Sequence, residues 1–171
     1  STCITVIGEV RVLLARTGYT GEDGFELFCA PSDAQPLWSM LLTPDHSGRA
    51  LVPCGVAARD LLRLEAGFRL YGQDIDESSN PLEAGLGWAV SQAKGEFVGR
   101  AALLKAASEG LKRKLVGLAV KPGAGIPRPG NLILVDGRRS GKVTSGGFSP
   151  SLGYGIAMGY LPTANHTGRR T

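Results

Sequence analysis

Aromatic residues make up only 6% of the 171-residue chain, and cysteine occurs only three times. Cys3, Cys29 and Cys54 are widely spaced and form no CxxC pair, and His46 and His166 lie in polar, loop-like segments. This spacing lacks the paired ligands of a zinc site, so we expect no metal site. Reduced thiols in a cytosol-like compartment are the simplest interpretation of the three cysteines.

The sequence also lacks a long apolar run and an extended basic segment. No run approaches the roughly 18 residues of a membrane-spanning helix, and no signal-peptide pattern opens the chain. The net charge is +4, but the basic clusters at 112–114 and 169–170 contain no interleaved aromatic residues. Aromatic side chains would be needed to stack on bases. We therefore expect a soluble protein that binds neither nucleic acid nor a membrane.

The remaining composition is that of a globular, loop-rich protein. Hydrophobic residues make up 43% of the chain and charged residues 20%, close to the globular average. The 25 glycines and 10 prolines indicate many turns. The chain opens inside a strand-like run without an initiator methionine and stops just after another such run, so we expect a piece of a longer protein.

The first part of the chain alternates strand and helix patterns. Residues 4–15 are rich in β-branched and aliphatic side chains and predict two strands around a turn at Gly8 and Glu9. Residues 17–24 contain three glycines and predict a tight loop, and residues 25–29 alternate with the period of a strand. A helix is predicted next, capped by Ser32 or Asp33. This order predicts half of an open α/β-sandwich.

Two further helices are predicted before the pattern changes. One covers residues 55–66, buries Val56, Leu61 and Leu64, and ends at Gly67 in the left-handed conformation. The other covers residues 100–109. The helix that begins after Ser32 or Asp33 is predicted to run to residue 42, with Leu37, Met40 and Leu41 as its apolar stripe.

After Gly110 the sequence changes to short strand candidates separated by Gly/Pro loops, at 115–120, 131–135, 142–144 and 156–161. Regular spacing of this kind indicates a small all-β sandwich or barrel. The predicted fold class is therefore α+β, with a partial α/β domain at 1–110 followed by a small antiparallel β-barrel domain at 111–171. The run 137–142 resembles a phosphate loop only superficially and is interpreted as a hairpin turn.

Two arginines and a glutamate are the candidate binding residues. Arg59 and Arg63 lie four residues apart and therefore on one helix face, where like charges need a carboxylate or a bound anion beside them. Either Asp60, Glu65 or a strand carboxylate pairs with them at the surface, or one arginine reaches a ligand with ring acceptors. Glu26 is either a solvent-facing strand residue or a carboxylate that accepts two parallel N–H bonds from an amino-pyrimidine edge.

The loop and helix sequences resemble those of the glycine-cleavage T-protein family, in the family's order and over roughly residues 10–162. The matching blocks are Arg16-Thr-Gly-Tyr-Thr-Gly-Glu-Asp-Gly-Phe-Glu26, Ala58-Arg-Asp-Leu-Leu-Arg-Leu-Glu-Ala-Gly67, Leu70-Tyr-Gly-Gln-Asp-Ile-Asp-Glu77, Pro81-Leu-Glu-Ala-Gly-Leu-Gly-Trp88 and Val143-Thr-Ser-Gly-Gly-Phe-Ser-Pro-Ser-Leu152. The chain thus resembles the C-terminal part of such a protein.

The resemblance implies an aminomethyltransferase that moves a carbon from the lipoyl arm of the H-protein to tetrahydrofolate and releases ammonia. It implies that Glu26 and Arg59 hold the pterin, that Tyr19 lies near the folate, and that Trp88 is an aromatic neighbour. It places the family's catalytic aspartate in an N-terminal segment that this chain does not contain, and a closing β segment beyond Thr171. The fragment alone is then expected to be inactive, and the parent to be cytoplasmic in a bacterium or in the mitochondrial matrix of a eukaryote.

Two alternatives stay open at this stage. The folate domain of a dimethylglycine- or sarcosine-oxidising enzyme shares much of the same motif set. A non-catalytic interaction module belongs to a different class and would not bind folate. The iron–sulfur-assembly folate relatives are disfavoured, because the segment Phe68-Arg-Leu-Tyr-Gly-Gln-Asp74 lacks the cysteine of their motif.

Overall fold

The computed structural model describes residues 1–163, which divide into two compact units, 1–66 and 67–163 of the described chain. This division follows the contacts within the chain. The domain boundary predicted near residue 110 follows a change in sequence pattern, lies elsewhere, and stays a prediction. His166 and the basic pair at 169–170 lie outside the described residues. Among helices of residues 1–163, none combines the length and apolar character needed to cross a membrane.

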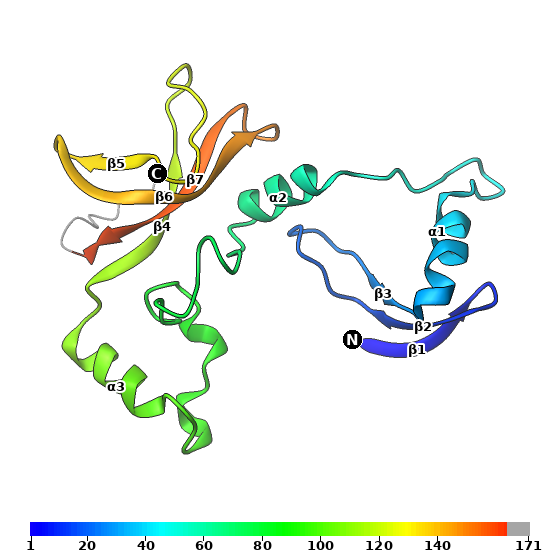
Figure 1. The fold of residues 1–171 in the computed structure, drawn as a ribbon, viewed down its shortest axis with the longest axis horizontal. Helices are drawn as coiled ribbons and strands as arrows, with labels where there is room; N and C mark the ends of the chain where they lie inside the picture. Colours follow the sequence, from blue (N-terminus) through cyan, green and yellow to red (C-terminus); the bar gives the residue numbers. More distant parts are fainter. Residues whose placement is uncertain (164–171) are drawn as a thin grey trace. The chain divides into compact units, whose positions relative to one another are not determined.

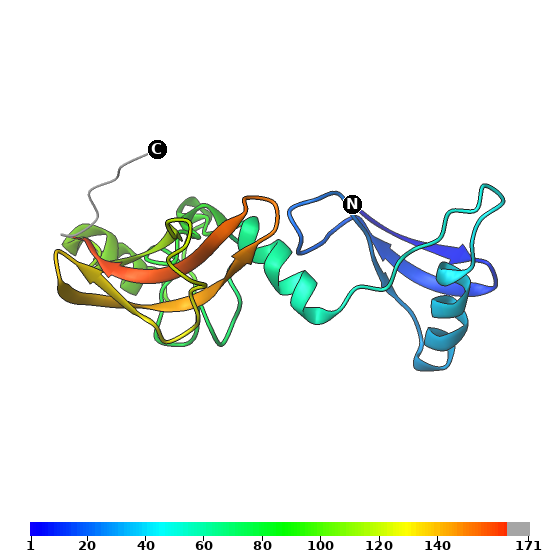
Figure 2. The ribbon, with the colours of Figure 1, turned by 90° about the horizontal axis from the view of Figure 1, so that it is seen from above.

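The first unit is a three-stranded antiparallel sheet with a helix against one face (Figure 1). Its strands lie in the order β1 (Thr2–Ile7), β2 (Val10–Ala15), β3 (Glu26–Phe28). Helix α1 (Ala34–Leu42) follows, and Figure 2 also shows it beside this sheet. The predicted strand pair, third strand and helix are confirmed, although no side chain caps α1.

The core of the first unit lies between α1 and one face of its sheet. Val10, Val12 and Leu37 are buried together, and Leu27 and Leu41 pack against them. Burying side chains of this size contributes about 1.5–3 kcal/mol each. Met40, predicted to share the stripe of Leu37, is 38% exposed and lies at the edge of the core.

The opposite face of this sheet presents apolar side chains to solvent. Ile4 pairs with Leu13 across β1 and β2, and Leu13 pairs with Phe28 across β2 and β3. Their exposed fractions are 64%, 42% and 55%. Glu26 lies on this same face, because side chains two residues apart on a strand point the same way.

Helix α2 (Val56–Glu65) ends the first unit, and Gly67 follows it with φ +71°, as predicted. The buried residues of α2 are Arg63 and Leu64. The prediction that Val56 is buried is wrong: its side chain is 79% exposed, because it occupies the first turn and the described unit places nothing over it.

The second unit contains helix α3 (Arg100–Glu109) and a four-stranded antiparallel sheet. Its strands are β4 (Arg113–Ala119), β5 (Leu132–Val135), β6 (Arg138–Ser149) and β7 (Tyr154–Pro162), in the order β4-β7-β6-β5 (Figure 1). All four predicted strands are present. The predicted hairpin turn is shorter than expected, because the tight turn occupies residues 136–137 and β6 already begins at Arg138.

The predicted barrel is only partly confirmed. The mixed α+β class holds, and every pairing of this sheet is antiparallel. Within residues 1–163, no pairing joins β4 to β5, so the described sheet stays open. Its core contains Val143, Ala157, Met158 and Leu161.

Candidate functional site

The glycine-rich loop between β2 and β3 is closed at its base by two side-chain contacts. Arg16 donates two hydrogen bonds to Asp23, at 2.8 and 2.6 Å. This bidentate contact lowers the pKa of Asp23 and raises that of Arg16. The hydroxyl of Thr17 donates to Oε2 of Glu26. The loop thus returns the chain to β3 with the Glu26 carboxylate held at its exit.

The loop also approaches the end of α2. At Gly21, where φ is +81°, an added Cβ would lie 2.7 Å from the Cβ of Ala66. Only glycine combines this left-handed backbone with so close an approach. Ala66 directly follows α2, so Gly21 lets the loop lie beside the helix that carries Arg59.

Tyr19 and Arg59 are brought together across this contact. The Arg59 guanidinium lies 4.7 Å from the centroid of the Tyr19 ring. Arg59 is exposed and Tyr19 is half-buried. Among residues 1–163, the Arg59 side chain has no hydrogen bond or ion pair, so its five donors are available to a ligand.

Arg63 has a different environment from Arg59, although both lie on one helix. Arg63 is completely buried and donates to Asp60 at 2.7 Å, whereas Asp60 itself is 44% exposed. Asp60 was one of the carboxylates expected to pair with the arginines, and it does pair with Arg63, but the Arg63 side chain is buried rather than at the surface. The second interpretation, a ligand-facing arginine, stays a prediction, and it concerns the exposed Arg59.

Glu26 is the second predicted site residue of the first unit. Its carboxylate is exposed, and Oε2 accepts from Thr17, so Oε1 has no hydrogen-bond partner within the described residues. The described chain shows no hydrogen bond or ion pair between Glu26 and Arg59. They are linked instead through the loop, by way of Thr17 and Tyr19. The sequence analysis did not single out Thr17, although a hydroxyl side chain at the second position of the matched loop motif could have indicated it.

Trp88, the fourth predicted site residue, belongs to the second unit. It lies in a short 3-10 turn, Gly87–Ala89, and is 84% exposed. An indole so exposed contributes little to the core of its own unit. Its part in a binding site therefore stays a prediction.

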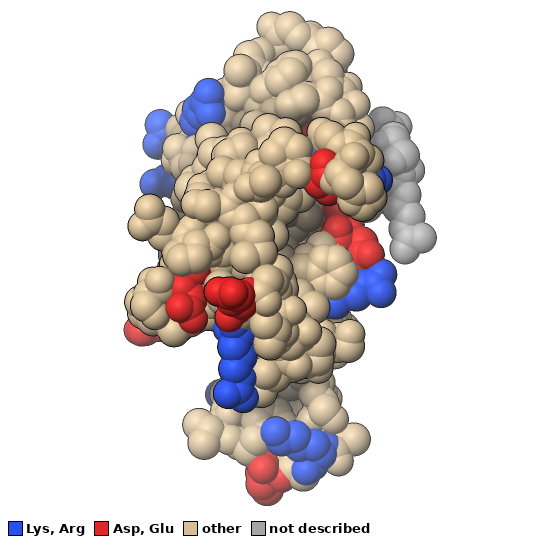
Figure 3. Space-filling view, turned by 90° about the vertical axis from the view of Figure 1, so that its right-hand side faces the viewer, with Lys and Arg blue, Asp and Glu red and all other residues tan. Residues whose placement is uncertain are grey.

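Charge on the surface gathers in small mixed groups. On the face drawn in Figure 3, basic and acidic atoms lie next to each other between larger uncharged areas. The exposed pairs Arg16–Asp23 and Arg49–Asp45 have this character. Within residues 1–163, no group of three or more His, Cys, Asp or Glu is arranged to hold a metal ion.

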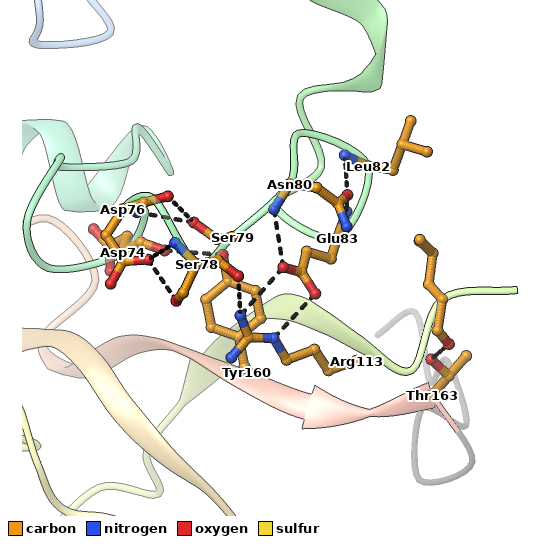
Figure 4. A network of polar contacts seen from close by, with 11 residues as sticks. Asp74, Asp76, Ser78, Ser79, Asn80, Leu82, Glu83, Arg113, Tyr160 and Thr163 are labelled. Atoms are coloured by element: carbon orange, nitrogen blue, oxygen red, sulfur yellow. Dashed lines mark hydrogen bonds and ion pairs between the residues drawn. The ribbon is translucent and has the colours of Figure 1, made fainter. Parts of the chain in front are cut away.

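A second polar cluster, unforeseen from the sequence, centres on Asp74 of the second unit, which Figure 4 shows at one side of a larger polar network. The Asp74 side chain is 1% exposed. Its carboxylate accepts hydrogen bonds from the hydroxyls of Thr144 and Ser145 and from the backbone N–H of Leu70, while Tyr160 donates to its carbonyl oxygen. This network ties the segment after α2 to β6 and β7.

Comparison with known proteins gives matches over both halves of the chain. Residues 2–94 match the family model described as the GCVT N-terminal domain, and residues 113–171 match the glycine cleavage T-protein C-terminal barrel domain. An aminomethyltransferase of Halothermothrix orenii is 54% identical over 151 residues, which cover 88% of this chain and 42% of that protein. One of Streptomyces avermitilis is 51% identical over 165 residues, covering 94% and 44%.

A solved structure gives the same result. The crystal structure of glycine cleavage system aminomethyltransferase T from Bartonella henselae aligns with a TM-score of 0.80 at 41% identity, over 90% of this chain and 42% of that one. The chain therefore spans less than half the length of the relatives that it matches.

Proposed function

The chain belongs to the glycine cleavage T-protein family, and we propose that it supplies the tetrahydrofolate-holding residues of an aminomethyltransferase. The reaction would transfer the aminomethyl carbon on the lipoyl arm of the H-protein to tetrahydrofolate. Ammonia leaves, and the products are reduced lipoyl and methylene-tetrahydrofolate. Because the relatives are more than twice as long, the activity belongs to the whole protein rather than to this chain.

The arrangement of Arg59, Tyr19 and Glu26 around one loop is the observation that carries the proposal. The Glu26 carboxylate can accept the 2-amino and N3 hydrogens of a pterin as two parallel bonds, one to each oxygen, because Oε2 keeps a second lone pair beside its bond from Thr17. The Arg59 guanidinium can donate to the acceptors of the ring and is already oriented by Tyr19. Ile4, Leu13 and Phe28 add apolar surface on the face that carries Glu26.

In this proposal Trp88 is an additional aromatic contact. Its exposed indole suits stacking on a planar ligand. Trp38 is also exposed, at 56%. A Trp38→Phe variant of the 171-residue chain therefore leaves Trp88 as its one tryptophan, and quenching of its fluorescence by tetrahydrofolate would report on Trp88 specifically.

Calorimetric titration of tetrahydrofolate under anaerobic conditions tests the proposal. The protein would be a chimera in which the part of the Halothermothrix orenii relative that lies N-terminal to the matched region precedes this chain. We expect the chimera to bind, and Glu26→Gln or Arg59→Lys to weaken binding about 10- to 100-fold, the effect of losing a charged hydrogen bond. Glu22→Gln is the matched control, because Glu22 is exposed in the same loop and its carboxylate has no partner among residues 1–163.

The same chimera separates the competing functions. Ammonia release from aminomethyl-lipoyl H-protein, absent from the 171-residue chain alone, is expected of the aminomethyltransferase. Folate binding with no such release would favour a folate domain of a dimethylglycine- or sarcosine-oxidising relative. A folded chimera that does not bind folate would leave the interaction module as the better explanation and end the proposal.

A further inference from the structure

The sheet of the second unit bears an open cavity of about 540 Å³, lined by residues of β4, β5, β6 and β7. Leu132, Leu161 and Pro162 form apolar parts of its lining. The cavity lies entirely within the second unit, whereas Glu26, Tyr19 and Arg59 all belong to the first. It therefore shares no lining residue with the residues proposed to hold folate.

The charged residues that line the cavity are Arg113, Arg139 and Lys142. No carboxylate is among the described residues of its lining. Neither Arg139 nor Lys142 makes a side-chain hydrogen bond or ion pair within residues 1–163. Elsewhere in the described chain, several cations are paired with carboxylates, as in Arg16–Asp23 and Arg100–Glu96.

An irregularity in β6 brings two of these cations to the same cavity. Ile133 pairs with Gly141, but the next residue, Leu134, pairs with Arg139, so Ser140 is an extra residue opposite this step. Residues three apart on a regular strand point to opposite faces. The β-bulge at Ser140 removes that alternation, and both Arg139 and Lys142 line the cavity.

Arg113 is the third cation, and its guanidinium is fixed in place (Figure 4). Its Nε and Nη2 donate to Glu83 at 3.0 and 3.2 Å, and its guanidinium carbon lies 4.4 Å from the centroid of the Tyr160 ring. Within the described chain, Nη1 has no hydrogen-bond partner. Glu83 offsets much of the Arg113 charge, so Arg139 and Lys142 supply most of the attraction for an anion.

We propose that this cavity binds a small organic anion, a carboxylate or phosphate group on an apolar body. Arg139 and Lys142 would hold the anionic group, Nη1 of Arg113 would donate one oriented hydrogen bond, and Leu132 and Leu161 would contact the apolar body. Charge interactions are stronger beside apolar surface than in bulk water, which favours this cavity over the open surface.

Titrations of the 171-residue chain with phenyl phosphate and with benzoate, followed by amide chemical shifts in two-dimensional NMR, test the proposal. We expect shifts localised to β4, β6 and β7, and dissociation constants at least about tenfold higher in Arg139→Ala/Lys142→Ala. Arg138→Ala/Lys121→Ala is the control, since it removes two exposed cations that do not line the cavity. Its net charge equals that of the Arg139→Ala/Lys142→Ala variant. Unchanged amide spectra before ligand addition establish that the variants are folded.

Comparing phenyl phosphate with benzoate shows whether the cavity prefers a phosphate or a carboxylate. Phenol represents the apolar body alone and inorganic phosphate the anionic group alone, and we expect each of these two to bind more weakly than phenyl phosphate. The proposal is overturned if neither anion binds, if the control variant loses affinity equally, or if phenol binds as tightly as phenyl phosphate. None of these outcomes bears on tetrahydrofolate binding at Glu26 and Arg59.

Discussion

The Arg59 guanidinium lies over the Tyr19 ring and so joins helix α2 to the glycine-rich loop between β2 and β3. A cation–π pair at an exposed site contributes about 0.5–1 kcal/mol, too little to fold the first unit but enough to select one position of a loop. The close approach of Gly21 to Ala66 favours the same position. The loop and helix are therefore arranged before any ligand arrives.

Replacing Tyr19 tests whether this stacking matters for binding. In the chimera described above, Tyr19→Leu removes the ring and is expected to weaken tetrahydrofolate binding about 3- to 10-fold, because Arg59 must then be ordered by the ligand itself. Tyr19→Phe keeps the ring and should change the affinity less. Calorimetry on both variants gives the comparison, and equal losses would show that the hydroxyl rather than the ring face is important.

Much of the fold could be predicted from the sequence because its local signals are strong. The two-residue alternation of β3 and the glycine after α2 each have one natural structural meaning, and both were confirmed. The long strand β6 was predicted only at residues 142–144, because its three glycines and three serines resemble a loop. These small residues are needed for close packing, which single-residue propensities do not include.

Arg63 and Asp74 show where such prediction ends. A charged side chain is almost always exposed, so their burial could not be inferred from residue type. Asp74 is buried because hydroxyl donors arrive from Thr144 and Ser145, about 70 residues further along the chain. The joining of Arg59 to Tyr19 is likewise a tertiary contact, and only the resemblance to a family singled out both residues.

The Glu83–Arg113 pair predicts an acid-sensitive stability of the second unit. Burial opposes ionisation of Glu83, but the hydrogen bonds from Arg113 and from the Asn80 backbone outweigh it and lower the pKa of Glu83 below its ordinary 4.5. The depressed pKa belongs to the folded state, so the pair contributes stability above about pH 4.5, which is lost as the pH falls through the lower folded value. Glu83→Gln should therefore reduce the loss of stability between pH 6 and pH 3.

Urea unfolding at a series of pH values measures this effect. Glu77→Gln is the control, because Glu77 is exposed and its carboxylate has no partner in the described chain. If the Glu83 variant and the parent lost stability in parallel on acidification, another carboxylate would be responsible.

Asp74 is expected to be the most sensitive polar residue of the second unit. Asp74→Ala removes the acceptor that lies 2.8 Å from the buried hydroxyl of Ser145, leaving that hydroxyl the longer contact of 3.3 Å to Gln73, and it removes the acceptor of the Leu70 N–H. Each unsatisfied buried group costs about 1–3 kcal/mol, so the free energy of unfolding should fall by several kcal/mol. Chemical denaturation measures the loss, and Asp76→Ala, at an exposed carboxylate two residues away, should cost less.

Two glycines of the same sheet provide a matched test of its packing. A Cβ at Gly141 on β6 would overlap the Tyr160 carbonyl oxygen, far closer than van der Waals contact allows, and this oxygen belongs to the backbone of β7 and cannot turn away. Gly141→Ala must therefore separate the two strands, and we expect it to cost about 1–3 kcal/mol or more. At Gly117 on β4, nothing lies within 4 Å of an added Cβ.

Gly117→Ala should consequently be neutral or stabilising by up to about 1 kcal/mol, because alanine loses less backbone entropy on folding. Thermal unfolding of both variants gives the difference directly. Both variants replace glycine by alanine in a strand of one sheet, so the change in β propensity is the same in each. The difference between their stabilities therefore reports the local space around the added Cβ. Equal melting temperatures would mean that β6 and β7 do not approach as closely as described at this point, which would also remove the wall that Gly141 gives to the cationic cavity.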